Sequence, residues 1–326
     1  MGQAYSCVGQ KPQALELCCG CPKHSKDVFE ELCLPLAQHR LSPLVTQPDS
    51  ADDSELKCEF FDKIELTGEL ARVVTLFNQR FGEFPLQVPP SVPVQLANGS
   101  LYEGQWSAGL RHGSGTEWVP GRSLYIGGFK RDRREGLGRL VHASGTFYQG
   151  SFSKGLACGS GVFVSRTGAE YRGQFRSNLQ FGKGTESYAD GSRYSGEFWT
   201  GMKHGTGTFR WANRKRYRGQ FRHNLMHGFG TLSWPDGRRY KGEWLAGKMH
   251  GRGQFDWPDG RRYRGQYFLE KQQGKGEMRW PSGQVYVGEW LQGRQHGAGT
   301  LSWPDEAGEW VTKVVVMCHG RVEKSI

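Results

Sequence analysis

The residues with the clearest chemistry stand at the start of the sequence, where a glycine and several cysteines could carry acyl chains. Gly2 follows Met1, and the hydroxyl residue Ser6 comes four positions later, which is the pattern of N-myristoylation. One myristoyl chain binds a membrane only marginally, so stable anchoring needs a second chain on a neighbouring cysteine. We therefore predict lipidation at Gly2 and at one or more of Cys7, Cys18, Cys19 and Cys21.

Two other interpretations of this segment stay open. A chain that begins Met-Gly can match the pattern by chance, and the cysteines at 18–21 could form a thiol-rich stretch without a modification. A zinc site would use Cys18, Cys21, His24 and Cys33. That spacing lacks a second Cys-x-x-Cys or His-x-x-x-His pair, so we predict no bound metal and no cofactor.

Basic residues form two columns at a spacing of 23 residues or its multiples. The first column is Arg193, Arg216, Arg239 and Arg262, the second is Arg172, Arg218, Lys241 and Arg264, and Lys215, Arg238 and Arg261 widen the stripe. Each column residue flanks a tyrosine, so in an extended strand it points away from the tyrosine side. Such a stripe suits anionic lipid headgroups, at about 1 kcal/mol per basic residue, or an acidic protein surface. A solvated face is the alternative, and nothing resembles a nucleic-acid-binding module.

Histidines also recur at multiples of 23 residues, at His112, His204, His227, His250 and His296. Positions one repeat apart lie about 10 Å from each other, whereas zinc holds histidine nitrogens at about 2 Å, so these histidines cannot share an ion. We predict that they are turn residues. No nucleophile, base and orienting acid recur together, which predicts a protein without enzymatic activity.

The elements that position these residues follow from an uninterrupted repeat of 23 residues. Nine Tyr-x-Gly triplets begin at Tyr102, Tyr125, Tyr148, Tyr171, Tyr194, Tyr217, Tyr240, Tyr263 and Tyr286. A second aromatic residue follows each by four positions, at Trp106, Phe129, Phe152, Phe175, Phe198, Phe221, Trp244, Tyr267 and Trp290. A Gly-x-Gly follows in register, from Gly113 to Gly297. Alternate residues of a strand share a face, so the tyrosine, its glycine and the second aromatic point the same way.

Each repeat predicts one β-hairpin. Gly-x-x-His-Gly, as in 247–251, tolerates positive φ and should reverse the chain into a second strand. Trp-Pro-Asp-Gly, as in 234–237, should turn it back to the next Tyr-x-Gly strand. A four-residue turn would place Trp234 opposite Arg239, and Trp257 opposite Arg262, as cation–π pairs. We expect the column of Tyr188, Trp211, Trp234, Trp257, Trp280 and Trp303 to serve packing, with ligand stacking as the alternative.

Nine hairpins joined head to tail predict an all-β repeat fold. It should be a single elongated antiparallel β-hairpin meander of about 18 strands and roughly 85 Å. Contacts would run between neighbouring strands only. Because a lone hairpin is marginally stable in water, the stacked aromatic columns must supply most of the stability.

These residues, for example 240–253 with the sequence YKGEWLAGKMHGRG, closely resemble the MORN (membrane occupation and recognition nexus) repeat family. The resemblance covers about two thirds of the chain. It implies a role as a scaffold or membrane tether, as in the junctophilins and the radial-spoke head proteins. Some copies depart from the pattern, which questions their local turn geometry: Cys158, Phe181 and Gln273 replace the histidine, and Arg214 replaces a turn glycine.

Four regions follow from these patterns. Residues 1–55 predict the lipidation motif and a flexible Cys- and Pro-rich tether, and 56–93 predict two short helices divided at Gly68, because apolar residues there recur at helical spacing. The helices should pack as a cap on the first repeats, with partner binding as the alternative. The repeats occupy 94–307, and 308–326 form a C-terminal strand and tail.

Charge and hydropathy restrict the localisation. Residues 1–93 hold 8 of the 43 basic and 13 of the 32 acidic residues, so the net charge is −5 there and +16 in 94–326. Six of the 8 cysteines precede the repeats, which is unlike a secreted disulfide framework. No stretch approaches the roughly 20 apolar residues that cross a bilayer. We expect a cytoplasmic protein that is peripheral to a membrane, with cytoskeletal association as a further option.

The two edges of an open meander offer unpaired backbone groups to other strands. The predicted helices should cover the N-terminal edge. At the other end, residues 309–317 read as a β-rich strand that either closes the sheet or pairs with its copy. We predict a homodimer through the last repeat, since two-fold pairing of identical surfaces is the commonest oligomer.

Together these features predict a non-enzymatic, lipid-anchored scaffold on the cytoplasmic leaflet. It would bind anionic phospholipids and link the membrane to cytoskeletal or other protein partners, and it would not bind nucleic acid. The alternatives are an axonemal or cytoskeletal structural protein without a lipid anchor, and a docking subunit of a partner enzyme.

Overall fold

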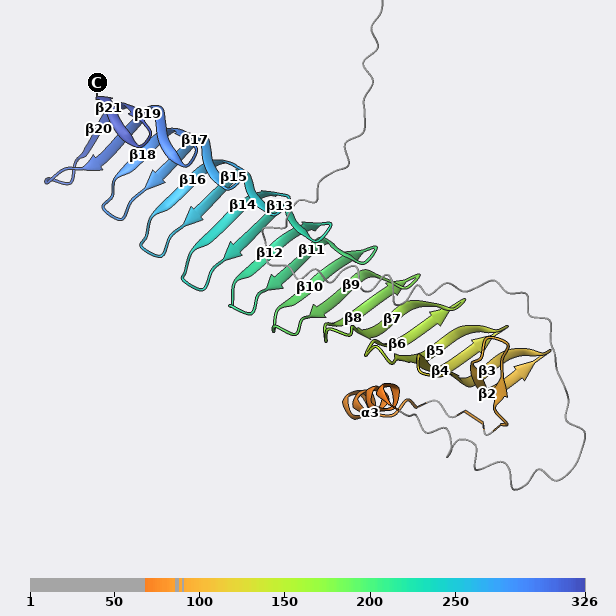
Figure 1. The fold of residues 1–326 in the computed structure, drawn as a ribbon. Coiled ribbons are helices and arrows are strands. Elements are labelled where there is room, and N and C mark those ends of the chain that lie inside the picture. Colours follow the sequence, from red (N-terminus) through yellow and green to blue (C-terminus); the bar gives the residue numbers. More distant parts are fainter. Residues whose placement is uncertain (1–67, 86–87, 90, 326) are drawn as a thin grey trace, which may run out of the picture.

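The computed structural model describes residues 68–85, 88–89 and 91–325, which form one helix and one 21-stranded antiparallel sheet (Figure 1). The helix is α3 (Glu69–Phe81). The strands are β1 (Val94–Gln95), β2 (Leu101–Ser107), β3 (Leu110–Val119), β4 (Ser123–Lys130), β5 (Arg133–His142), β6 (Phe147–Ser153), β7 (Leu156–Val164), β8 (Glu170–Arg176), β9 (Leu179–Ser187), β10 (Arg193–Trp199), β11 (Met202–Arg210), β12 (Arg216–Arg222), β13 (Leu225–Ser233), β14 (Arg239–Leu245), β15 (Lys248–Asp256), β16 (Arg262–Phe268), β17 (Lys271–Arg279), β18 (Val285–Leu291), β19 (Arg294–Pro304), β20 (Trp310–Cys318) and β21 (Arg321–Ser325).

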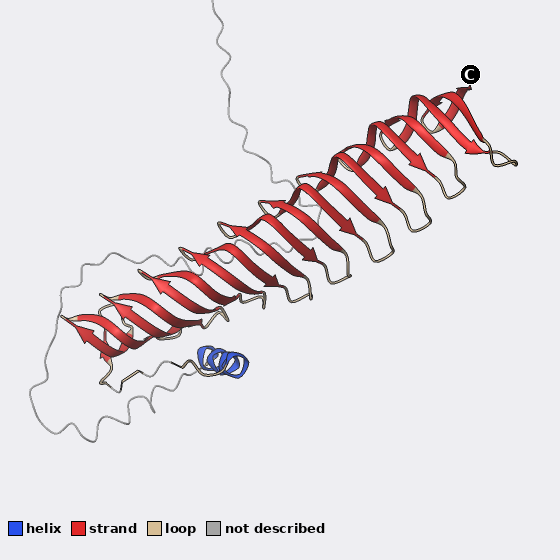
Figure 2. Ribbon diagram, turned by 180° about the vertical axis from the view of Figure 1, so that it is seen from behind, coloured by secondary structure: helices blue, strands red, loops and turns tan. Residues whose placement is uncertain are grey.

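Each strand pairs with the next along the chain, so the sheet is a meander from β1 to β21. Figure 2 shows the strands as one elongated layer. Strands β2 to β19 are the 18 strands of the nine predicted hairpins, and they confirm the all-β repeat meander. β1 precedes them, and β20 and β21 follow.

The first turn of each repeat lies earlier than the sequence predicted. In the seventh repeat Leu245 pairs with Lys248, so the chain reverses at Ala246 and Gly247, whose φ angles are 48° and 84°. Two residues with positive φ make the type I′ turn that suits a hairpin. His250 therefore lies inside β15, and the prediction that the histidines are turn residues was wrong. The pairing shifts between Gly242 and Glu243 of β14, so Gly251 and Arg252 have no partner in β14 and form a β-bulge in the second strand.

The second turn is one residue shorter than predicted. The Trp234 N–H donates to the Arg238 carbonyl at 2.9 Å, so the three residues between them form the turn. As expected, Gly237 has positive φ, 92°. The register of β13 and β14 therefore differs by one residue from the predicted register, and Ser233, not Trp234, pairs with Arg239. The predicted cation–π partners were therefore wrong: the guanidinium of Arg238 lies 5.4 Å from the Trp234 ring centroid, and Arg261 lies 5.4 Å from that of Trp257.

One face of the sheet, here called the tyrosine face, carries a continuous column of rings. Tyr240 meets Trp244 of its own strand edge to face, with centroids 5.1 Å apart, and Tyr267 of the next repeat at 5.2 Å. The same alternation links all nine tyrosines from Tyr102 to Tyr286. Such pairs contribute about 0.5–1.5 kcal/mol each beyond burial, so this column binds neighbouring repeats together.

The repeat glycines leave room for the tyrosine side chains. The Tyr240 ring lies over Gly242 and Gly253, which pair across two strands. A Cβ on Gly242 would lie 2.6 Å from the Tyr240 hydroxyl oxygen, which is far inside contact distance. That hydroxyl donates to the Glu243 carbonyl at 3.0 Å, beside the bulge. The Tyr-x-Gly and Gly-x-Gly patterns are thus two parts of one packing unit.

The helix α3 coincides with the second predicted helix and packs on the first repeats as predicted, but it does not cover the N-terminal edge of the sheet. The first predicted helix lies outside the described residues. The helix α3 lies against one face of the sheet (Figures 1 and 2). Its contact with Phe147, which precedes Tyr148 in β6, shows that this is the face opposite the tyrosines, here called the opposite face. Buried Leu70, Val73 and Phe77 pack on this face, where the Phe77 and Phe147 rings stack at 4.4 Å. The opposite face of the early repeats is apolar, so the helix can bury more apolar surface there than against a strand edge. The two-residue strand β1 pairs with β2 at the edge instead.

At the other end of the sheet, β20 is followed by one more strand. Residues Val315–Cys318 of β20 pair with β21, which is exposed along its whole length. The predicted edge strand is therefore covered over its C-terminal half. The helix of the described part of the chain, α3, is too short and too polar to cross a bilayer.

Candidate functional site: a basic face opposite the tyrosines

The candidate site is the opposite face of repeats four to eight. Two rows of side chains cross it, and their members pair from strand to strand. Row A contains Ser187, Arg193, Arg210, Arg216, Ser233, Arg239, Asp256, Arg262 and Arg279. Row B contains Arg172, Thr185, Ser195, Thr208, Arg218, Thr231, Lys241, Gln254, Arg264 and Glu277. Each row is continuous because the bulges lie nearer the other end of the hairpins.

All eight predicted stripe residues are exposed in these rows: Arg193, Arg216, Arg239 and Arg262 in row A, and Arg172, Arg218, Lys241 and Arg264 in row B. The tyrosine beside each of them is buried. Strand alternation therefore separates charge from rings, as the sequence predicted. Whether this surface binds lipid or protein stays a prediction.

Sequence reasoning missed two arginines of row A. Arg210 lies on β11 between Arg193 and Arg216, and Arg279 lies on β17 beside Arg262. They do not flank a Tyr-x-Gly triplet, so a search by tyrosine spacing passes over them. Counting alternation along the second strand from its Gly-x-Gly would have found both. Their presence reduces the distance between neighbouring charges from two strand spacings to one.

The charges of the basic face are mostly unpaired. Among the described residues, Arg262 forms an ion pair with Asp256 at 2.6 Å, Arg279 forms one with Glu277, and Arg172 forms one with Glu170. No ion pair within the described ranges involves the other six stripe residues or Arg210. Arg193, Arg210 and Arg216 thus stand in register on three adjacent strands. Like charges directly opposite each other are destabilising, so this arrangement favours a bound anion.

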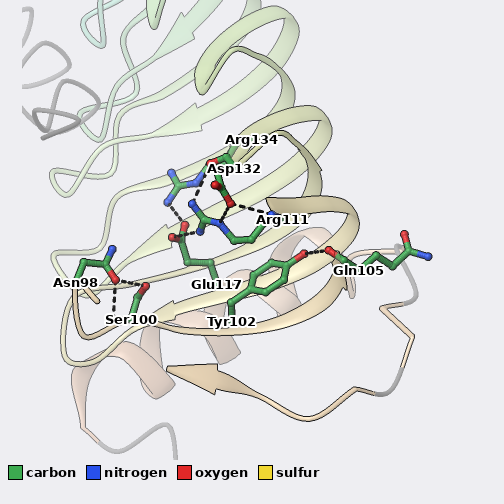
Figure 3. A network of polar contacts seen from close by, with 8 residues as sticks. All are labelled: Asn98, Ser100, Tyr102, Gln105, Arg111, Glu117, Asp132 and Arg134. Carbon is green, nitrogen blue, oxygen red and sulfur yellow. Dashed lines mark hydrogen bonds and ion pairs between the residues drawn. The ribbon is translucent and has the colours of Figure 1, made fainter. Parts of the chain in front are cut away.

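Two basic residues of the tyrosine face are neutralised within the molecule. Glu117, which is 8% exposed, forms ion pairs with Arg111 at 2.6 Å and with Arg134 at 2.9 Å. Arg111 also forms an ion pair with Asp132 (Figure 3). Burial alone would raise the pKa of Glu117, but the guanidiniums of Arg134 and Arg111 more than offset this and lower it. Glu117 is therefore a structural anion. The unpaired arginines of row A, by contrast, belong to the opposite face.

The basic face also has an apolar border on the side of the first turns. Trp199 is 50% exposed and Phe268 is 55% exposed, at the ends of β10 and β16. Leu245 occupies the same position in β14. Phe229, 63% exposed, stands between this border and row B. Large apolar side chains are thus exposed to solvent next to the arginines.

The basic face ends where α3 begins. In the earlier repeats row A continues as Glu170, Val164, Phe147 and Val141, and α3 covers its apolar part. Glu170 lies at the boundary and forms an ion pair with Arg80 of α3. One continuous row therefore contacts a helix in the early repeats and carries exposed arginines from repeat five to repeat eight.

The other predicted site residues have different outcomes. The lipidation candidates Gly2, Cys7, Cys18, Cys19 and Cys21, and the alternative zinc ligands, lie outside the described residues. The column from Tyr188 to Trp280 packs partly buried against the core, which agrees with a packing role. Arg214 adopts the left-handed conformation of the glycine it replaces, φ 68°, and its turn keeps the hydrogen bonds of the other copies.

An elongated meander of similar hairpins with a ring column defines this chain as a β-hairpin repeat protein. The MORN repeat family model matches residues 102–121, 125–147, 148–170, 171–193, 194–216, 217–238, 240–261, 263–285 and 286–307. These segments make up more than half of the chain. The protein belongs to the MORN repeat family, and such repeats suggest a scaffold or binding role.

Comparison with other proteins adds little to this assignment. No curated protein matches the chain. The TCP domain of SAS-4 (dCPAP) of Drosophila melanogaster, in complex with a proline-rich motif of Ana2 (dSTIL), is similar at 15% identity and a TM-score of 0.31, over 47% of this chain and 83% of that one. The G-box domain of the microcephaly protein CPAP has 11% identity and a TM-score of 0.27, over 65% and 97%. A streptogramin B lyase has 9% identity and a TM-score of 0.15, over 74% and 95%.

Proposed function

We propose that the opposite face of repeats four to eight binds the anionic surface of a membrane, and that the protein acts there as a peripheral scaffold. The observation that carries this proposal is the in-register set of Arg193, Arg210 and Arg216, which has no acidic partner among the described residues. Phosphate-bearing headgroups would neutralise these guanidiniums, and each basic residue near an acidic leaflet adds about 1 kcal/mol of attraction.

The apolar border favours a membrane over an acidic protein as the partner. Phe229, Phe268 and Trp199 are large, exposed and adjacent to the basic rows. Aromatic side chains enter the boundary between headgroups and acyl chains, whereas basic residues stay at the headgroups. A sheet face that combines the two matches a peripheral membrane surface.

Acylation of Gly2, with a second chain on Cys7, Cys18, Cys19 or Cys21, is part of the same proposal. The acyl chains would supply the anchor and the basic face would orient the sheet on the leaflet. A myristoyl chain and a basic surface together reach the two signals that stable attachment needs. In cells, Gly2→Ala should move the protein from the membrane to the soluble fraction, and alkyne-myristate labelling should be lost.

The test is cosedimentation of the full chain, made without acylation, with vesicles of phosphatidylcholine alone or with phosphatidylserine. Replacing Arg193, Arg210 and Arg216 by Glu should weaken binding to the acidic vesicles by at least about 100-fold, since three contributions of about 1 kcal/mol are lost. Raising the salt should weaken the wild type, because exposed charges are screened beyond about 8 Å in physiological salt.

A matched control changes the net charge equally at other exposed sites. Arg122, Arg131 and Arg166 lie in turns of the earlier repeats, and their triple replacement by Glu should leave binding near the wild-type value. Equal binding by the wild type and the row A variant would show that the basic face does not bind the membrane and is only a solvated surface. Binding of the wild type to an acidic protein, without any binding to vesicles, would favour the protein partner instead.

A further inference from the structure

We propose that His296, Cys318 and His319 form a zinc site at the C-terminal end of the sheet. One ligand atom of each residue lies within 4.8 Å of the other two. Among the residues that the structure describes, this is the only group of three or more potential ligands that meets this distance. The site lies in and beyond the ninth repeat, so it is separate from the basic face of repeats four to eight.

The three side chains have the chemistry that zinc prefers. A thiolate and two imidazoles are typical zinc ligands, at about 2.3 Å for sulfur and 2.0–2.1 Å for nitrogen, and a water molecule can fill the fourth position. Cys318 and His319 are exposed, so their side chains can rotate by the small amount that closes the site. The Cys318 sulfur already lies 3.4 Å from His319 Nδ1. On binding, the Cys318 thiol releases its proton to solvent.

Backbone pairing brings these residues together. His296 lies on β19, whereas Cys318 ends β20 and His319 begins the turn to β21. The Gly320 N–H donates to the Gln295 carbonyl at 2.8 Å, which holds this turn beside His296. The His296 and His319 rings meet at 5.4 Å between centroids. The fold therefore positions the site before any ion binds, whereas the repeat spacing of His296 alone had predicted no metal.

Other repeats show what is particular to this position. His204, His250 and His296 are equivalent, and Nδ1 of each is buried without a hydrogen-bond partner among the described residues. His250 faces the Phe268 ring, and His204 faces the single imidazole of His223. Of these three equivalent histidines, only His296 meets both a second imidazole and a thiol. An ion there would tie the β20–β21 hairpin to the last complete repeat.

The experiment titrates zinc into the reduced full chain against a chromophoric chelator and follows hydrogen exchange in peptides from 310–325. We expect the wild type to bind one more equivalent of zinc than Cys318→Ser, and zinc to slow exchange in this hairpin. His296→Gln should weaken this site by more than about 100-fold, beyond the effect of losing an outer-shell partner. The repeats already hold both replacement residues at equivalent positions, so the fold should tolerate them. Ser153 ends β6 as Cys318 ends β20, and Gln273 occupies the position of His296 one repeat earlier.

Two matched controls isolate the site. His250→Gln removes the equivalent histidine of the seventh repeat, and Cys158→Ser removes the other cysteine of the described residues. Neither should change zinc stoichiometry or hydrogen exchange in the hairpin. Equal stoichiometry in the wild type and Cys318→Ser, or zinc protection that persists in His296→Gln, would overturn the proposal. Zinc held by the N-terminal cysteines would be unaffected by either variant, so it cannot imitate the expected result.

Discussion

Each repeat tyrosine combines three contacts in one side chain. The Tyr240 ring covers Gly242 and Gly253, its edge meets two aromatic rings, and its hydroxyl donates to the Glu243 carbonyl. These contacts leave the nine tyrosines almost completely buried. A buried phenol resists ionisation, because the phenolate would lose its hydration.

We predict that the folded protein loses stability at alkaline pH. Burial raises the pKa of Tyr102 from 10.0 to about 12 and raises the pKa values of the other repeat tyrosines. The folded protein therefore holds these protons to higher pH than the unfolded chain. Stability should be complete below pH 10 and fall as the pH rises from about 10 through 12, by up to about 1.4 kcal/mol per pH unit for each tyrosine. Urea unfolding at a series of pH values, with tyrosinate absorbance, measures this. An unchanged free energy of unfolding between about pH 9 and 11 would contradict it.

At the scale of the element, the two turns set which residues meet. The type I′ turn at Ala246 and Gly247 fixes the first register, and the three-residue turn after Trp234 fixes the second. Both differ from the predicted turns by a small number of residues. Those differences place His250 in a strand and bring Arg238 instead of Arg239 to the Trp234 ring.

The fifth repeat offers a test of turn strain. Arg214 has a φ of 68°, whereas the equivalent Gly237 and Gly260 have 92° and 89°. An L-residue with a side chain in this conformation costs roughly 1 kcal/mol relative to glycine. Arg214→Gly should therefore raise the free energy of unfolding by about 1 kcal/mol in chemical denaturation. Lys215→Gly, one residue later, should not raise it, and a lower stability of Arg214→Gly would contradict the strain.

At the scale of the whole molecule, an open sheet must protect two edges. β1 covers only two residues of β2, and β21 covers only the C-terminal half of β20. Trp310 and Val314, in the part of β20 that β21 does not cover, are 62% and 49% exposed. The C-terminal end therefore keeps both apolar surface and strand edge for association.

We predict a tail-to-tail dimer of the full chain through this end. Two copies of the same edge can pair about a two-fold axis, and this would bury the exposed Trp310. Light scattering should give twice the monomer mass, and deletion of 308–326 should return the mass to that of one chain. A monomer at tens of micromolar, or a dimer that persists after the deletion, would rule out this arrangement.

The sequence by itself determined the repeat, the hairpins and the face of each strand residue. These depend on local rules: the spacing of 23 is uninterrupted, and side chains alternate with a period of two. The exposure of Arg216 and the burial of Tyr217 could therefore be predicted without any knowledge of tertiary contacts.

Tertiary structure decided the strand register at the turns, the surface on which α3 packs and the contacts between residues of different strands. Register depends on which residues accept positive φ and on where the bulge falls, and a change of one residue alters every pair. Arg210 joins Arg193 and Arg216 only through that register. His296 lies near Cys318 because the turn between β20 and β21 is hydrogen-bonded to β19. The helix α3 packs on the early repeats because they have apolar side chains where later repeats have arginine. The contacts of α3 and of His296 join different regions of the chain, so no local pattern could specify them.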